Sequence, residues 1–209
     1  MTEFHVIGIG NAIIDVIQST EDQDLIDMGV QKGIMQLVER ERSEFLLAQQ
    51  ARRGKARLVP GGSVANTLAG IGRMGLKTAF IGRVADDELG QAYAQDTKAE
   101  GTQFINAPVS GGNLPTSRSI IFVTPDGERS MNTYLGISAN LGPDDVADEV
   151  FEGNKWLFLE GYLFDKPAGK AAFLAAANAC HREGGQAGIA LSDPFCVDRH
   201  RDDFRKLVS

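Results

Sequence analysis

Residues 60–67 read Pro60-Gly61-Gly62-Ser63-Val64-Ala65-Asn66-Thr67, and the pattern of the chain changes from strand to helix within them. Two glycines lead into a segment in which small or apolar residues recur at steps of three and four. Glycine lets backbone N–H groups approach a ligand closely, and the first helical turn offers N–H groups without intrahelical partners. One interpretation is therefore a ligand-binding bend, with the Asn66 amide one turn into the helix. The other is a helix cap without a ligand, in which Ser63 is the N-cap.

Strand and helix patterns alternate on both sides of this bend. Apolar and β-branched residues predict strands at 4–9, 13–17, 78–84, 117–123, 129–135, 156–159 and 188–191. Helical spacing and propensity predict helices at 63–74, 88–99, 144–151, 168–183 and 199–207. Such alternation predicts an α/β fold with a mostly parallel sheet and helices on both faces. The turn at 124–127 joins two strands into a hairpin that does not fit this repeat, which indicates a small β appendage.

Composition narrows the class of protein and its partners. The 209-residue chain is 43% hydrophobic, which is enough for a folded domain with its own core. Its formal net charge of -7 repels polyanions, so we expect a small-molecule partner and neither nucleic acid nor a membrane. Cys180 and Cys196 lack CxxC spacing, and we interpret them as buried thiols rather than a disulfide or metal site. The apolar run at 6–9 is too short for a signal sequence or membrane span, so we expect a cytoplasmic protein.

Three nucleotide-binding motifs are incomplete in this chain. Gly8-Ile9-Gly10 follows a predicted strand, but the third glycine of a dinucleotide-binding fingerprint would fall at Ile13. His200-Arg201-Asp202 resembles a protein-kinase catalytic loop, yet the Asn that should follow would fall at Leu207. We therefore interpret this triplet as part of a charged surface helix. The sequence also contains no Walker-type phosphate loop.

Asp15 is a carboxylate within an otherwise apolar strand-like run, five residues after Gly10. Burial of an unpaired carboxylate is strongly unfavourable, so this side chain needs a hydrogen-bond donor as a partner. A sugar diol presents two hydroxyls to one carboxylate, and Asn11 can add an amide contact from the same segment. An Asp exposed at a strand end is the alternative that these residues leave open.

Three blocks together, in this order and spacing, resemble the ribokinase-like (PfkB) family of carbohydrate and nucleoside kinases. The first block runs from Gly8 to Asp15, the second contains Gly61-Gly62-Ser63 and Asn66, and the third occupies 81–90. Residues 129–136 are most similar to the adenosine-kinase-like branch. The resemblance covers essentially the whole chain. It implies one ribokinase-like unit over 1–209, with a β lid formed by excursions at about 13–38 and 103–134.

The resemblance also implies roles for individual residues. In the family, substrate hydroxyls are bound at positions that match Asn11, Asp15, Gly61, Gly62 and Asn66. We include Ser63 in this set. Arg129 matches an arginine near the lid hinge that can neutralise phosphate charge, and a surface pair with Asp126 or Glu128 is the alternative.

The family's chemistry requires a C-terminal Gly-Ala-Gly-Asp block, whose Asp is the general base, and an Asn-x-x-Glu element associated with magnesium. Neither occurs here, so the resemblance implies a catalytic Asp beyond Ser209 and an inactive chain when it stands alone. We expect the complete protein to transfer the γ-phosphate of ATP, with Mg²⁺, to a hydroxyl of an adenosine-like nucleoside. The alternatives are a non-catalytic nucleoside- or sugar-binding module and a kinase for ribose or fructose. Both a monomer and a homodimer are compatible with the resemblance.

Overall fold

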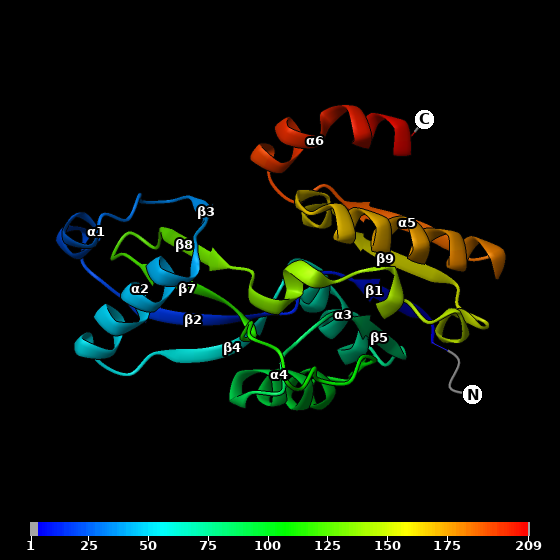
Figure 1. Cartoon of the computed structure of the whole chain (residues 1–209), viewed down its shortest axis with the longest axis horizontal. Helices are drawn as coiled ribbons and strands as arrows, with labels where there is room; N and C mark the ends of the chain where they lie inside the picture. The colour runs from blue at the N-terminus through cyan, green and yellow to red at the C-terminus, as the bar shows by residue number, and fades with distance from the viewer. Residues whose placement is uncertain (1–3, 209) are drawn as a thin grey trace.

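A computed structural model describes residues 4–208 and contains two five-stranded sheets, which lie side by side in Figure 1. The first, here called the body sheet, is parallel throughout and has the strand order β10-β9-β1-β5-β6. Its strands are β1 (Val6–Ile9), β5 (Thr78–Ile81), β6 (Thr102–Phe104), β9 (Trp156–Glu160) and β10 (Gln186–Ala190). The expected α/β class with a parallel sheet is confirmed.

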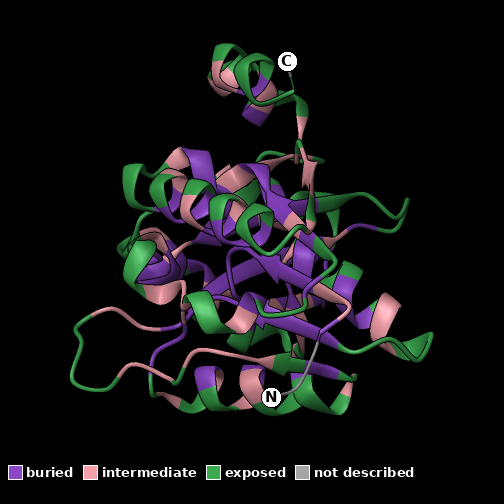
Figure 2. Ribbon diagram, turned by 90° about the vertical axis from the view of Figure 1, so that its right-hand side faces the viewer, coloured by how far each residue is buried: buried purple, intermediate pink, exposed green. Residues whose placement is uncertain are grey.

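Helices cover both faces of the body sheet, because alternate strand residues point to opposite sides. The covering helices are α3 (Ser63–Arg73), α4 (Glu88–Ala99) and α5 (Pro167–Arg182). Ile7 and Ile9 of β1 belong to the core on the side of α5. Gly8, between them, faces α3, and a Cβ added there would lie 2.5 Å from Val64. Burial on both faces, visible as purple strands in Figure 2, explains why these strands read as nearly continuous apolar runs.

The last helix, α6 (Pro194–Leu207), starts earlier than the expected residue 199. Its N-cap is Asp193, whose carboxylate accepts a hydrogen bond from Cys196 N–H at 2.7 Å, and a proline occupies the first helical position. The helix is kinked at His200, where the backbone leaves the helical conformation.

The second sheet, here called the lid sheet, has the strand order β3-β8-β7-β2-β4 and combines parallel and antiparallel pairs. Its strands are β2 (Ile13–Ser19), β3 (Met35–Leu37), β4 (Arg57–Gly61), β7 (Ser117–Val123) and β8 (Arg129–Tyr134). β7 and β8 form the expected antiparallel hairpin. Two helices, α1 (Asp22–Met28) and α2 (Arg40–Arg53), cover one face, since Leu25, Leu46 and Phe122 share a core. The opposite face borders the cavity described below.

The lid strands depart from the expected excursions at 13–38 and 103–134. The first excursion continues through α2 and β4 to Gly61, and residues 102–104 belong to the body sheet as β6. The signal for α2 was weak because two of its three buried residues, Ser43 and Gln50, are polar. The lid is consequently larger than its sequence pattern indicated.

Residues 144–151, expected as a helix, also differ from the prediction. They contain two short 3-10 turns, η2 (Pro143–Asp145) and η3 (Asp148–Phe151). The Asp145 carboxylate accepts hydrogen bonds from Gly142 N–H at 2.9 Å and from the Arg83 guanidinium at 3.0 Å. The contact with Arg83 holds the first turn, η2, against the end of β5, and no continuous helix forms over these residues.

Cys180 on α5 and Cys196 on α6 are buried free thiols, as expected. Across residues 4–208, no helix combines the length and apolar character needed to cross a membrane. The two sheets meet where β1 leads into β2 through residues 10–12 and β4 leads into α3 through Gly62. Residues of both sheets therefore converge at the carboxyl edge of the body strands, where ligands of open α/β sheets bind.

Candidate functional site

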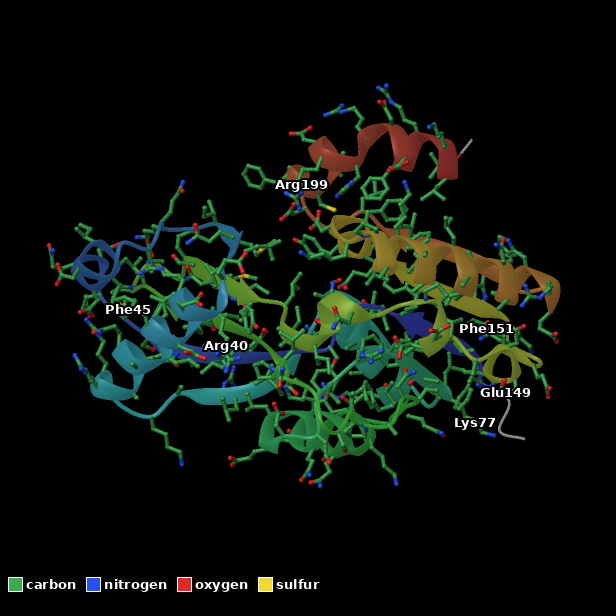
Figure 3. The ribbon with its side chains drawn as sticks, viewed as in Figure 1. Arg40, Phe45, Lys77, Glu149, Phe151 and Arg199 are labelled. Atoms are coloured by element: carbon green, nitrogen blue, oxygen red, sulfur yellow. The ribbon has the colours of Figure 1, made fainter. Side chains whose placement is uncertain are left out.

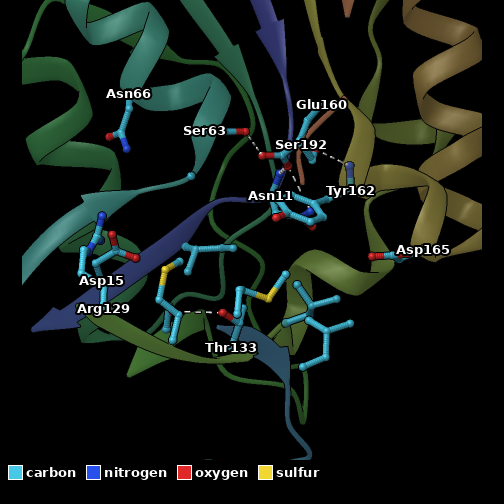
Figure 4. A pocket seen from close by; sticks show the side chains of 17 residues that line it. Asn11, Asp15, Ser63, Asn66, Arg129, Thr133, Glu160, Tyr162, Asp165 and Ser192 are labelled. Carbon is cyan, nitrogen blue, oxygen red and sulfur yellow. Dashed lines mark hydrogen bonds between the residues drawn. The ribbon is translucent and has the colours of Figure 1, made fainter. Parts of the chain in front are cut away.

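A cavity of about 270 Å³ lies at the junction of the two sheets, between the carboxyl ends of the body strands and the free face of the lid sheet (Figure 4). This volume is close to the lower end of the range for small-molecule sites. The cavity is lined by the polar residues Asn11, Asp15, Ser63, Asn66, Ser119, Arg129, Thr133, Glu160, Tyr162, Asp165 and Ser192. All of the expected site residues except Gly61 are among its lining residues, and Gly61 is buried directly beside Asp15.

Glu160, the last residue of β9, lies at the inner wall of the cavity and is 2% exposed. Its Oε2 accepts hydrogen bonds from Asn11 N–H at 2.6 Å and from Asn11 Nδ2 at 3.1 Å. Its Oε1 accepts one from the Ser63 hydroxyl at 2.6 Å. Burial raises the pKa of Glu160, while these donors act in the opposite direction. One carboxyl group thus connects the β1–β2 crossing to the first turn of α3.

Sequence reasoning did not single out Glu160, Tyr162, Asp165 or Ser192. A signal for Glu160 was available, because it follows a buried apolar strand and so resembles Asp15 in its apolar run. Tyr162, Asp165 and Ser192 do not lie in a local sequence pattern that indicates a binding site. They reach the cavity because β9 and β10 are parallel and end at the same edge of the body sheet.

Asp15 lies on β2 and lines the cavity. Among residues 4–208, it has no hydrogen-bond donor as a partner. Burial raises the pKa of Asp15 to about 6, and the positive charge of Arg129 opposes this rise. The expectation of an Asp exposed at a strand end is therefore not met. This partly buried carboxylate retains its full capacity to accept hydrogen bonds from a ligand.

Arg129, the first residue of β8, is exposed and lies beside Asp15 at one end of the cavity (Figure 4). Neither of the alternative surface pairs is formed. The carboxylate of Asp126 pairs instead with Lys32 at 2.6 Å, and Glu128 makes no ion pair with Arg129. The guanidinium is consequently available at the mouth of the cavity.

Tyr162 and Asp165 form the wall opposite Asp15 and are held by α6 and the residues before it. The Tyr162 hydroxyl donates to Asp193 at 2.7 Å, and its backbone N–H donates to Ser192 Oγ at 3.1 Å. Arg199 on α6 (Figure 3) donates to both oxygens of Asp165 at 3.0 and 2.8 Å. Of the triplet at 200–202, Arg201 and Asp202 are exposed on α6 as expected, whereas the ring of His200 lies at the kink and hydrogen-bonds to Asp165 at 2.7 Å.

The lid side of the cavity combines apolar and polar groups. Its apolar wall is formed by Ile13, Met35, Leu37, Met131 and Leu135, and its polar groups are Asp15, Arg129 and the hydroxyls of Ser119 and Thr133. The body side carries Glu160, Asn11, Ser63 and Asn66. This arrangement suits a ligand with hydroxyl groups on one part and an apolar ring on another.

Gly61 and Gly62 are needed for steric reasons. A Cβ at Gly61 would lie 2.5 Å from Asp15 Oδ1, and one at Gly62, where φ is +98°, would lie 2.7 Å from the Asn11 carbonyl oxygen. Both contacts are too short for a real side chain. The bend can therefore bring its backbone close to these two polar residues only because both positions are glycine.

We predict that Gly61→Ala displaces the Asp15 carboxylate and weakens ligand binding at least tenfold, because the methyl group takes the space that the carboxylate occupies. Gly70→Ala on the exposed side of α3 is the matched control. A Cβ there meets no atom within 4 Å, so this change should leave binding intact and stabilise the helix by up to about 1 kcal/mol. Calorimetric titration and thermal unfolding measure the two effects. Equal loss of binding in both variants would contradict the steric explanation.

Within residues 4–208, no group of three or more His, Cys, Asp or Glu side chains is arranged to hold a metal ion. The polar side chains that line the cavity are instead a hydrogen-bonding set of three carboxylates, two amides, five hydroxyls and a guanidinium. We therefore assign no magnesium ligand to the described residues.

The sequence profile of the pfkB family of carbohydrate kinases matches residues 33–209. Among solved structures, the adenosine kinase from Sinorhizobium meliloti is 44% identical with a TM-score of 0.89, and the match covers 99% of this chain and 62% of that one. A probable sugar kinase protein from Rhizobium etli CFN 42 is 46% identical with the same TM-score of 0.89, again with coverage of 99% and 62%. These matches extend over both sheets of the present chain.

Among curated proteins, the 5-dehydro-2-deoxygluconokinase of Geobacillus thermodenitrificans is 32% identical over 118 residues. This match covers 55% of the present chain and 35% of that relative. The chain thus spans about a third of this relative and 62% of the two solved structures.

Proposed function

Because the chain belongs to the pfkB family of carbohydrate kinases, we propose that it forms the acceptor-binding part of an enzyme that phosphorylates a sugar or nucleoside hydroxyl with ATP. In such a transfer, the acceptor oxygen bonds to the γ-phosphorus, ADP leaves, and the hydroxyl proton passes to a general base. In this proposal the described residues bind and orient the acceptor.

The observation that carries the proposal is the Asp15 carboxylate, which borders the cavity and has no hydrogen-bond donor as a partner among residues 4–208. Two neighbouring hydroxyls on a sugar ring supply the donors that it lacks. Asn11 and Asn66 border the same space, as does the backbone of Gly62. Arg129 beside Asp15 is placed to neutralise phosphate charge near the mouth of the cavity.

We favour an adenosine-like nucleoside as the acceptor. Two observations support this choice: the apolar lid wall, which offers contact to a flat ring, and the 44% identity to the adenosine kinase from Sinorhizobium meliloti. Ribose, fructose and 5-dehydro-2-deoxygluconate are the competing acceptors. Each would contact Asp15 through hydroxyls but would leave the apolar wall without a partner.

We expect adenosine to raise the melting temperature of this chain by roughly 5–10 °C at a hundredfold excess over Kd, and the three sugars to raise it less. Only a ligand of the native state stabilises it, so differential scanning fluorimetry ranks the candidates directly. Failure of every candidate to shift the transition would refute the proposed acceptor site.

ADP release by the complete protein, measured with each stabilising compound and Mg-ATP, separates the kinase from a non-catalytic binding module. A kinase releases ADP in proportion to acceptor consumed. A module stabilised by the acceptor but without such release would contradict the enzymatic part of the proposal.

A further inference from the structure

Tyr93 on α4 lies beneath the Gly61–Gly62 bend and is completely buried. Its hydroxyl donates a hydrogen bond to the Gly61 carbonyl oxygen at 3.1 Å. The ring is fixed by Phe104, at a centroid distance of 5.6 Å in edge-to-face geometry, and by Phe80 at 6.3 Å. Burial also raises the pKa of Tyr93, so the phenol remains a donor at neutral pH. A rigid aromatic cluster therefore holds one defined donor against the bend.

This hydrogen bond acts on the peptide between Gly61 and Gly62, at the end of β4, where Gly61 also pairs with Ile13 of the lid sheet. The described residues contain no cis peptide bond, and in a trans peptide the C=O and N–H groups point in opposite directions. With its carbonyl held toward Tyr93, the peptide directs Gly62 N–H away from Tyr93. Gly62 borders the cavity, and its N–H donates to no acceptor among residues 4–208.

The peptide needs an external constraint because glycine restricts backbone rotation so little. Gly62 already has a φ of +98°, a region that other residues rarely adopt, and no side chain at either position can limit the peptide's orientation. Tyr93 itself does not border the cavity. The hydrogen bond to the Gly61 carbonyl is the polar contact that connects Tyr93 to the bend.

We propose that Tyr93 is a positioning residue of the acceptor site, whose hydroxyl holds the Gly61 carbonyl so that Gly62 N–H stays directed to an acceptor oxygen. This inference rests on the proposed function, namely that the cavity binds a hydroxylated acceptor. It assigns a role in recognition to a buried helix residue outside the cavity.

The test compares Tyr93→Phe with Tyr134→Phe. Each removes one hydroxyl from a buried tyrosine, but the Tyr134 hydroxyl makes no hydrogen bond within residues 4–208 and its ring faces Arg118 on the other side of the lid sheet. Calorimetry with adenosine should show a Kd about three- to tenfold higher for Tyr93→Phe and an unchanged Kd for Tyr134→Phe. In the complete protein, the acceptor KM should rise by the same factor while the KM for ATP stays constant.

A purely structural role predicts a different result. Tyr93→Phe would then lower the urea midpoint but bind adenosine as tightly as the wild type, and that outcome would overturn the inference while leaving the proposed function intact. If the wild type bound neither adenosine nor the competing sugars, both the proposed function and this inference would fall. Far-UV circular dichroism of each variant verifies that the fold is retained before the titrations are compared.

Discussion

Asp15→Asn is expected to weaken acceptor binding by about a hundredfold and, at the same time, to stabilise the ligand-free protein above pH 6. The binding loss follows because two charge-assisted hydrogen bonds to acceptor hydroxyls become neutral, at roughly 1–2 kcal/mol each. The gain in stability follows from burial, which raises the pKa of Asp15 from 3.8 to about 6. The ionised Asp15 carboxylate therefore destabilises the ligand-free protein but strengthens the binding of the acceptor.

The pH dependence has a definite sign. A carboxyl group whose folded pKa lies above its unfolded value stabilises the fold when protonated, and this contribution is present in full below pH 3.8. It is lost as the pH rises through about 6. Each unit of difference between the two pKa values corresponds to about 1.4 kcal/mol in the free energy of unfolding. Because Asp15 is partly exposed, we expect Asp15→Asn to raise the free energy of unfolding by about 1–2 kcal/mol at pH 7.5.

Urea unfolding at a series of pH values from 4 to 8, with calorimetric titration of adenosine at pH 7.5, measures both effects. Asp202→Asn on the exposed face of α6 is the control for loss of one negative charge, and it should change neither quantity. The explanation would be wrong if Asp15→Asn and the wild type had the same stability at pH 7.5, or if the variant bound adenosine normally.

Glu160→Ala is expected to destabilise the protein by about 3–4 kcal/mol and to abolish acceptor binding. The change removes the acceptor for Asn11 N–H at 2.6 Å, for Asn11 Nδ2 at 3.1 Å and for the Ser63 hydroxyl at 2.6 Å. Asn11 is 5% exposed, and each buried group that loses its hydrogen-bond partner costs about 1–3 kcal/mol. The crossing from β1 to β2 would then no longer be held against α3.

Glu160→Gln provides the matched comparison. Its amide oxygen can accept from Asn11, and its amide N–H can donate to the Ser63 hydroxyl, whose hydrogen rotates freely. We expect stability within about 1 kcal/mol of the wild type and retained adenosine binding. Chemical unfolding and titration of the two variants distinguish a hydrogen-bonding role from a need for negative charge. If Glu160→Gln lost binding but kept normal stability, the result would indicate that binding requires the negative charge of Glu160.

The helices and strands that the sequence predicts correctly are those whose two ends are marked by capping residues or by the limits of an apolar run. Helix α4 runs from Glu88 to Ala99 as expected, because Asp87 caps its start and Gly101 follows its end. Strand β7 likewise matches its apolar run at 117–123. Helix α2 was missed, since most of its surface is polar and it is held by contacts with the lid sheet rather than by its own periodicity.

The sequence by itself predicted the α/β class, the family and six of the residues that line the cavity, because these depend on local spacing and on short motifs. Only the tertiary structure decided how those residues act on one another. Glu160 meets Asn11 across 149 residues of chain, and the pairing of β2 with β4 brings Asp15 against Gly61. Hydrogen bonding and desolvation depend on distances of a few ångströms between distant segments, and only the folded chain defines such distances.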